Sequence, residues 1–421
     1  MNNRYANHPI DSKSYDTKQL REHYLVEEVF IDDKIELTYS HVDRIIFGGI
    51  KPVKESLKLE AGNYKLIEIS SPSGYLIDKN GLPFSIGNDT HYNYTTYGAF
   101  VTVYFKDAPI KGQVEVNKTG EKFVVNNGTI KYEEIKLDGV VFNVYADEDI
   151  KTSDGQHIYY NKGDLVDIIT TDANGYAISK KLPLGKYYLV ETKTKDDHVL
   201  IDKKYYFELT EENNTTAIVY DLYTAHNSLK KGDLEFTKTD LVDGEVIPNV
   251  EISIYTEKDE LVFNGKTDSN GKIVIKDLYI GKYYLIEKNP ATGYILNDEK
   301  IFFEIKNNEI VKAHMTNKKI TSTLKLTKEN EDKEKLVGVV FGIYDLEGNL
   351  LSSHVTNEEG IIEVELEYGS YYYQEMATLE GYVLSDEKQY FDVTVDGMVI
   401  HNTIVNEKIT SILKIYKTDE N

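Results

Sequence analysis

The feature of this sequence that most constrains its fold is a repeated segment of seven residues. In each copy a glycine leads into a tyrosine-containing stretch that ends at a glutamate. The four copies begin at Gly62, Gly185, Gly281 and Gly369. Repetition at intervals of this size indicates an array of similar structural units along one chain.

Two further segments recur around the first in a fixed order. One precedes it and ends in lysine, at Lys118, Lys238, Lys328 and Lys417. The other follows it and ends in asparagine, at Asn227, Asn317 and Asn406. Successive lysines are 120, 90 and 89 residues apart. Two repeats of nearly equal length and one longer repeat indicate a common scaffold whose first copy carries inserted loops.

Short stretches of alternating apolar and polar residues fill the space between these segments, as in Val340–Tyr344. Turn sequences such as Asp268-Ser-Asn-Gly271 separate them. The chain contains 34 Tyr against 14 Phe, and tyrosine suits the half-buried surface of a pleated sheet. Many short strands separated by turns predict an all-β fold of tandem β-sandwich domains in a linear array.

The repeats divide the chain into five expected parts. Residues 1–111 are expected to form a divergent or truncated β-sandwich domain, and residues 112–231 a β-sandwich domain with insertions. Two shorter domains are expected at 232–321 and 322–410. Residues 411–421 are then the first strand of a further, truncated domain.

Composition excludes several classes of function. A net charge of −23 excludes a nucleic-acid partner, because phosphate binding requires a positive surface. The absence of cysteine excludes disulfides, thiol nucleophiles and cysteine-bound metals. The ten histidines lack the spacing of metal ligands, and no glycine-rich phosphate loop is present. We therefore expect no cofactor and no metal.

Three recurring polar residues lie on the apolar faces of their predicted strands. Residues two apart in a strand share a face. On this rule Lys238 lies on the face of Phe236, and Glu287 on the face of Leu285. The lysines and glutamates of the other two copies follow the same rule. The alternation is clear around Asn317 and less regular around the asparagines at 227 and 406.

Buried charges without partners are costly, so these residues require a common explanation. A buried Lys–Glu salt bridge beside the asparagine is one, and a lysine that extends to the surface is another. The fixed order of lysine, glutamate and asparagine in three copies favours a third. A desolvated lysine loses its proton and becomes a nucleophile, while a neutral glutamate polarises the carboxamide and moves protons as ammonia leaves. The product is an amide between two side chains.

The three segments together resemble the B-type domains of collagen adhesins and the SpaA-type domains of pilins. These domains have a prealbumin-like, Ig-like fold and form isopeptide bonds in Gram-positive adhesins and pili. The resemblance covers about residues 112–409. It implies the bonds Lys118–Asn227, Lys238–Asn317 and Lys328–Asn406. It also implies that the assisting acids are Glu191, Glu287 and Glu375.

The first unit departs from this pattern. Glu68 ends its copy of the seven-residue segment, and Asp107 lies on the apolar face of its last predicted strand. We expect Lys34–Tyr39 to be the counterpart of Val340–Tyr344, and on that alignment the nearest candidate for the lysine is Lys18. A degenerate or truncated domain is the alternative.

The resemblance implies the structural stalk of a Gram-positive surface adhesin or pilin, outside the cell and anchored to the wall. Residues 1–20 are polar and no apolar run has membrane-spanning length, so we expect the signal peptide and anchor to lie outside this fragment. Expected partners are a host surface or matrix component or other pilus subunits, for a monomer without enzyme activity. The alternative is a module formed by residues 1–111 that binds a host protein or glycan.

Overall fold

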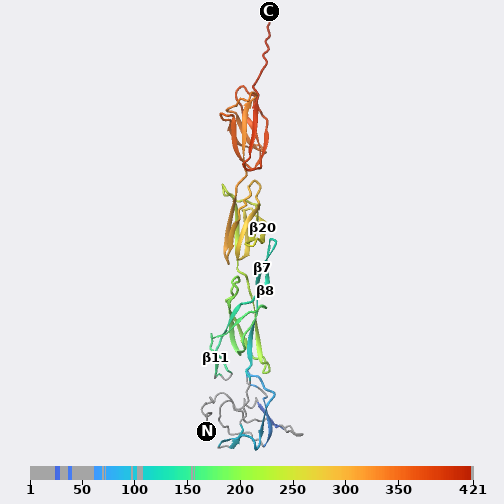
Figure 1. Ribbon diagram of the computed structural model, residues 1–421, viewed down its shortest axis with the longest axis vertical. Helices are drawn as coiled ribbons and strands as arrows, with labels where there is room; N and C mark the ends of the chain where they lie inside the picture. The colour runs from blue at the N-terminus through green and yellow to red at the C-terminus, as the bar shows by residue number, and fades with distance from the viewer. Residues whose placement is uncertain are drawn as a thin grey trace. The chain divides into compact units, whose positions relative to one another are not determined.

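The computed structural model describes residues 24–28, 37–39, 61–68, 71, 73–95, 98–101, 108–152, 155 and 157–418 (Figure 1). Within these ranges the chain forms 31 strands and no helix, so the predicted all-β fold of tandem sandwiches is confirmed. None of the described residues form a helix of the length and apolar character needed to cross a membrane. The chain divides into two compact units, Met1–Lys122 with Glu134–Leu229, and Phe123–Glu133 with Lys230–Asn421.

The strands from β7 onward form three sandwiches, which we number along the chain: the first contains β7 to β17, the second β18 to β24 and the third β25 to β31. The second sandwich has the simplest arrangement, with two sheets. One sheet has the order β21-β18-β24, with bounds Lys272–Tyr279, Lys231–Asp240 and Ile310–Asn317. The other has the order β20-β19-β22-β23, with bounds Leu261–Lys266, Glu251–Thr256, Gly281–Asn289 and Ile301–Ile305. The inward residues of both sheets, among them Phe236, Ile252 and Leu285, form one core. The first strand, β18, therefore lies beside the last, β24, and the two are parallel.

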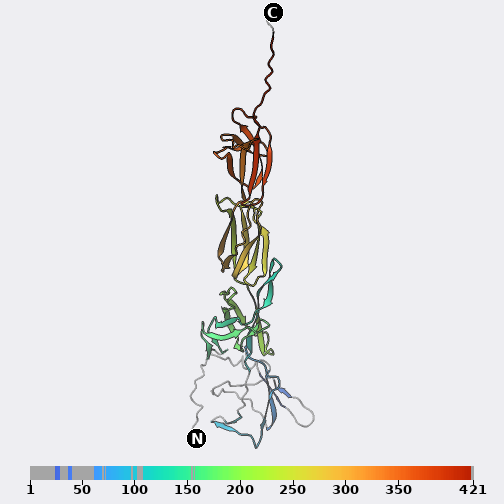
Figure 2. The same ribbon diagram turned by 45° about the horizontal axis from the view of Figure 1, so that its top comes forward.

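The third sandwich repeats this topology with strands β25 to β31 (Figure 2). Its sheets have the orders β28-β25-β31, at Ile361–Glu367, Thr321–Asn330 and Val399–Asn406, and β27-β26-β29-β30, at Leu350–Val355, Val340–Asp345, Gly369–Ala377 and Gln389–Val393. Again the first and last strands are parallel neighbours. The core contains Leu326, Phe341 and Tyr373.

The first sandwich is built from strands β7 to β17. One sheet has the order β12-β9-β15-β16, at Leu165–Thr170, Val141–Ala146, Gly185–Lys193 and Tyr205–Leu209. In the other, β7 (Lys111–Asn126) pairs with β8 (Thr129–Lys136), β13 (Tyr176–Ile178), β14 (Leu182–Pro183) and, in parallel, β17 (Ile218–Asn227). The insertions expected from the longer repeat are the β7–β8 hairpin and a second hairpin of β10 (Ile150–Lys151) and β11 (Ile158–Tyr160).

The described part of residues 1–111 contains a sheet of order β2-β1-β3-β4 and a short pair, β5 with β6. Their bounds are Leu37–Tyr39, Tyr24–Glu28, Gly62–Glu68, Leu82–Ile86, Asn93–Thr95 and Gly98–Phe100. This order matches β27-β26-β29-β30, so β1 takes the place of β26. The predicted equivalence of Lys34–Tyr39 with Val340–Tyr344 is therefore wrong. Strand pairing decides the equivalence, and β2 pairs at the edge of the sheet.

The tip of the β7–β8 hairpin, Phe123–Glu133, belongs to the same compact unit as the second sandwich. The Phe123 ring stacks on Tyr279 with centroids 5.2 Å apart, and the Gly128 amide donates a hydrogen bond of 2.8 Å to the Leu261 carbonyl. Figure 1 shows the hairpin in teal beside β20. The apolar residues of the tip thus extend the core of the second sandwich.

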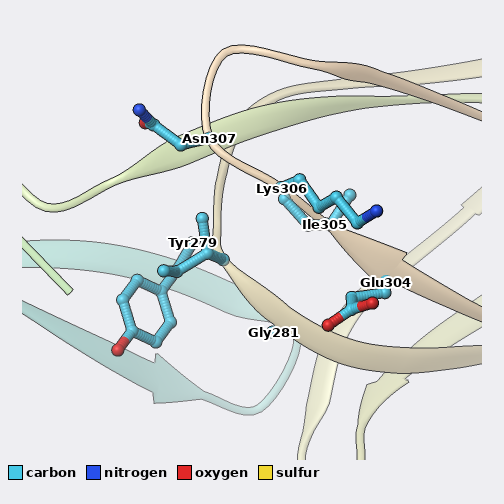
Figure 3. Close-up of a pocket in the computed structure, with 7 residues that line it drawn as sticks. Tyr279, Gly281, Glu304, Ile305, Lys306 and Asn307 are labelled. Atoms are coloured by element: carbon cyan, nitrogen blue, oxygen red, sulfur yellow. The ribbon is translucent and has the colours of Figure 1, made fainter. Parts of the chain in front are cut away.

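A shallow hollow lies next to this contact, lined by Tyr279–Gly281 and Glu304–Asn307 (Figure 3). The Tyr279 ring points from its rim toward the teal strands of the hairpin, and Glu304 and Lys306 lie along β23 and the turn that follows it. None of the lysines, glutamates or asparagines singled out in the sequence lines it. The hollow borders the hairpin contact only through Tyr279 and lies outside the site described below.

We predict that Phe123→Ala destabilises the second sandwich by about 1–2 kcal/mol, because it removes a half-buried ring and its stacking on Tyr279. Hydrogen exchange of the β21 amides measures the effect, which should be an increase in rate. Lys122→Ala, at the exposed neighbouring position, is the matched control and should leave exchange unchanged. Equal exchange in F123A and K122A would show that the tip contributes no stability.

Candidate functional site

In the first sandwich, Lys118, Glu191 and Asn227 meet in the core. The Lys118 Nζ donates a hydrogen bond of 2.5 Å to Asn227 Oδ1, and Asn227 Nδ2 donates one of 2.6 Å to Glu191 Oε1. The Lys118 Nζ also lies 2.7 Å from Glu191 Oε2. Each of the three groups therefore contacts the other two. We call this arrangement, here and in the other sandwiches, the Lys–Glu–Asn trio.

The second sandwich contains the same trio, formed by Lys238, Glu287 and Asn317. The Lys238 amine donates to Asn317 Oδ1, and Asn317 Nδ2 donates to Glu287 Oε1 at 2.7 Å. The distance from Lys238 Nζ to Glu287 Oε2 is 3.1 Å.

In the third sandwich the trio consists of Lys328, Glu375 and Asn406. The Lys328 amine donates to Asn406 Oδ1, Asn406 Nδ2 donates to Glu375 Oε1 at 2.6 Å, and Lys328 Nζ lies 3.3 Å from Glu375 Oε2. All three lysines are 0% exposed, and the asparagines and glutamates are at most 4% exposed. The structure thus brings together all nine residues that the sequence singled out in these three repeats.

Sheet topology explains why the trio forms. The lysine lies on the first strand of a sandwich and the asparagine on the last, and these two strands are parallel neighbours in one sheet. In the second sandwich Lys238 is in register with Met315, two residues before Asn317. Glu287 reaches the pair from β22, a central strand of the opposite sheet. The site therefore requires both layers of the sandwich.

A glycine turn fixes the backbone of each lysine. The Lys238 amide donates a hydrogen bond of 2.8 Å to the carbonyl of Gly271, and this glycine has a φ of 68°. A Cβ atom on Gly271 would lie 2.6 Å from the Lys238 carbonyl oxygen. Gly175 and Gly360 stand in the same relation to the other two lysines. Only glycine combines this backbone conformation with so close an approach.

Burial changes the ionisation of the lysines. Desolvation lowers the pKa of Lys118, Lys238 and Lys328 below the ordinary value of 10.5, and the facing glutamate opposes this effect in each case. A lowered pKa increases the fraction of the amine that is neutral, and therefore nucleophilic, at a given pH. The trio therefore places a nucleophile against a carboxamide, with a carboxyl group that contacts both and can exchange protons with both.

Sequence reasoning missed a hydroxyl group in two of the sites. Thr194 Oγ1 accepts a hydrogen bond of 2.8 Å from Asn227 Nδ2, and Thr378 Oγ1 accepts one of 2.7 Å from Asn406 Nδ2. Each threonine stands three residues after the glutamate, so the common spacing was a usable signal. In the second sandwich that position is Pro290.

A buried histidine near the first trio was also missed. His198 is 3% exposed, and its ring nitrogens contact Asp197 Oδ1 at 2.7 Å and the Glu121 carbonyl at 3.1 Å. It forms an isolated bridge with Leu229, as Tyr294 and Tyr382 do with residues 319 and 408. The first sandwich therefore has histidine where the other two have the tyrosine of a Gly-Tyr turn.

The candidate site of residues 1–111, formed by Glu68, Asp107 and Lys18, falls largely outside the described residues. The backbone of Glu68 ends β3, where it pairs with Tyr24. Lys18 and Asp107 lie outside the described residues. Their participation in a cross-link stays a prediction.

No group of three or more histidine, aspartate or glutamate side chains suited to holding a metal ion occurs among the residues that the structure describes. Many acidic residues there pair with lysines or accept hydrogen bonds within the chain, as Asp268 does from the backbone amides of Asn270 and Lys272. The chemistry available in the described sites is that of the trio itself.

Comparison with protein families gives one match to a family model. The model, SpaA, described as a prealbumin-like fold domain, matches residues 112–222, 232–319 and 322–408. The second and third matched ranges each contain a complete trio. The first contains Lys118 and Glu191 and ends five residues before Asn227.

Among solved structures, the chain is similar to the TIE protein of Bacillus anthracis, with 28% identity and a TM-score of 0.58 over 83% of this chain and 61% of that one. It is also similar to BcpA, the major pilin subunit of Bacillus cereus, with 17% identity and a TM-score of 0.35 over 71% of this chain and all of that one. The chain thus shares its fold with the TIE protein over most of its length.

A curated relative gives a local match of a different kind. A 4-deoxy-L-threo-5-hexosulose-uronate ketol-isomerase of Bacillus licheniformis is 48% identical over 64 residues, which are 15% of this chain and 23% of the isomerase. The chain spans less than a quarter of the length of the curated relatives it matches. A match of this extent does not transfer the isomerase activity.

The lowered lysine pKa predicts a pH dependence of stability in a chain that keeps the amine. Asn317→Ala removes the carboxamide and leaves Lys238 buried. The unfolded chain then holds more protons on this lysine than the folded one, so the second sandwich gains stability as the pH rises toward 10.5. Denaturant unfolding between pH 7 and pH 10 measures the slope.

The double variant Lys238→Met with Asn317→Ala is the matched control, since it lacks the titrating amine. Its stability should rise less over the same range. If both variants show the same slope, Lys238 keeps an ordinary pKa in the folded domain.

Proposed function

Because this chain belongs to the family of SpaA prealbumin-like fold domains, we propose that it is a stalk region of a Gram-positive surface adhesin or pilin, stiffened by Lys–Asn isopeptide bonds. The observation that carries the proposal is the trio, repeated with the same contacts in three sandwiches. In each, the amine contacts the carboxamide in an interior from which water is excluded.

The bond forms by a balanced exchange of one amide for another. In the second sandwich the Lys238 ammonium gives a proton to Glu287, and the neutral nitrogen attacks Cγ of Asn317. Glu287 then delivers this proton to Nδ2, which leaves as ammonia, and takes up the second proton that Nζ loses, so that Glu287 ends as the neutral acid. The products are an Nζ–Cγ amide and one molecule of ammonia. Each site reacts once, so the chain is a substrate of its own chemistry and has no turnover.

The position of the bond suits a protein that carries tension. Force enters a sandwich at its first strand and leaves at its last, and the bond joins these two strands directly. In the second sandwich it closes a loop of 79 residues. By analogy with a disulfide, a loop of this size removes about 4–5 kcal/mol of unfolded-state entropy, and it does so without cysteine.

The expected location on the cell surface and the expected partners, a host component or other pilus subunits, are part of this proposal. The match to SpaA prealbumin-like fold domains supports them. The binding of a host ligand by residues 1–111 stays a prediction, since much of that part lies outside the described residues.

Intact-mass measurement of the full chain tests the bonds directly. We predict a mass below that of the unmodified sequence by one ammonia for each of three bonds. Glu287→Ala should restore one ammonia, because the proton carrier of the second sandwich is lost, whereas Glu257→Ala, at an exposed position on the same domain, should restore none. A mass equal to that of the unmodified sequence contradicts the proposal.

Single-molecule stretching tests the mechanical role. We predict that the wild-type second sandwich does not extend under load, because the Lys238–Asn317 bond bypasses the segment between these two residues, whose sequence separation is 79. Asn317→Ala should release that segment, with an added contour length of roughly 270 Å at ~3.4 Å per residue. The third sandwich of the same molecule is the internal control. Release of the full length in the wild type would exclude a stalk protected by these bonds.

A further inference from the structure

The threonines that contact the reacting carboxamide occur in two of the three sandwiches. Thr194 follows the last residue of β15, and Thr378 follows the last residue of β29. Both are half-buried, whereas the asparagines they contact are buried. The hydroxyl group therefore lies between the carboxamide nitrogen and the surface of the domain.

A carboxamide nitrogen has two hydrogens to donate, and in these two sites both have an acceptor. In the third sandwich Asn406 Nδ2 donates to Glu375 Oε1 at 2.6 Å and to Thr378 Oγ1 at 2.7 Å, while Oδ1 accepts from the lysine. Three hydrogen bonds in different directions fix the plane of the carboxamide. The Cγ atom is then held in one orientation toward the incoming amine, as a near-attack geometry requires.

The second sandwich offers a natural comparison. Its Asn317 makes the same contacts with Lys238 and Glu287, but the residue three positions after the glutamate is Pro290, which has neither a hydroxyl nor a backbone N–H. Pro290 is half-buried, as the two threonines are. The exchange of threonine for proline therefore changes the hydrogen bonding of the carboxamide nitrogen at a position of similar exposure.

We propose that Thr194 and Thr378 are positioning residues for isopeptide formation, which hold the carboxamide during attack and accept a hydrogen bond from the departing ammonia. The inference rests on the proposed cross-link. The reaction keeps the balance given above: the amine nitrogen bonds to Cγ, the Cγ–Nδ2 bond breaks, and the glutamate supplies the proton. The threonine hydroxyl is neither consumed nor ionised.

The test follows the rate at which each bond forms in the full chain. Protein made in a short pulse of cell-free synthesis is sampled over time, quenched in acid and digested, and the cross-linked peptide of each domain is measured by mass spectrometry. Thr378→Val, which keeps the shape and removes the hydroxyl, should slow the bond of the third sandwich roughly three- to tenfold, the effect of one lost hydrogen bond. Thr378→Ser should restore the wild-type rate to within about twofold.

Two controls separate positioning from folding. Thr192→Val makes the same change at an exposed site two residues before Thr194 and should leave the first bond unaffected, whereas Thr194→Val should slow it. In a Lys328→Met chain, which cannot form the third bond, T378V and T378S should both keep a folded third sandwich with protected β31 amides in hydrogen exchange, so that the rates compare folded domains. Loss of that protection in T378V alone would assign Thr378 a structural role and overturn the inference.

The possible failures are distinguishable. If the bonds form and T378V and T194V react at the wild-type rate, the threonines have no positioning role and the cross-link stands. If no domain of the wild-type chain loses ammonia, the cross-link itself is wrong.

Discussion

The structure depends on placing an amine in the interior of each sandwich. Each of these lysines is 0% exposed, and its side chain lies between the two sheets of its sandwich. Such burial is tolerated only if a glutamate and an asparagine are in place to pair with the amine. The parallel pairing of first and last strands supplies the asparagine, and the opposite sheet supplies the glutamate. The same contacts that make burial of Lys238 possible also bring its Nζ to the carboxamide group that it would attack. Folding and chemistry therefore have the same geometric requirement.

The alternation of side chains was enough to predict the fold class and the inward direction of the lysines, because a strand of period two has only two faces. It could not identify Thr194 or Thr378, which follow the ends of strands where the period no longer applies. The side-chain alternation also gave the wrong position for the strand of residues 1–111 that is equivalent to β26. The stretch Lys34–Tyr39 has the expected pattern, but pairing with β3 belongs to Tyr24–Glu28, and pairing is a long-range property.

The spacing of repeats indicated insertions in the first copy but not what they contact. The tip of the β7–β8 hairpin, including Phe123 and Ile130, packs with the core residues of the second sandwich. A sequence pattern assigns an apolar residue to a core but does not say which core, when two similar ones are adjacent in the chain. Only the contacts resolve this, and they make the tip of the insertion, Phe123–Glu133, part of the compact unit that contains the second sandwich.

The surroundings of the trio vary among the three copies while the trio does not. Two residues after each lysine stand Gly120, Asp240 and Asn330. A Cβ atom on Gly120 would lie 3.0 Å from the His198 ring, whereas Asn330 donates to the Tyr382 hydroxyl at 3.2 Å. In the first sandwich the glycine leaves room for the histidine ring, whereas in the third the asparagine forms a hydrogen bond with the tyrosine hydroxyl. The same position is therefore filled in two different ways. Because these neighbours differ between copies while the lysine, glutamate and asparagine keep their contacts, the geometry of the trio is the property that the scaffold maintains.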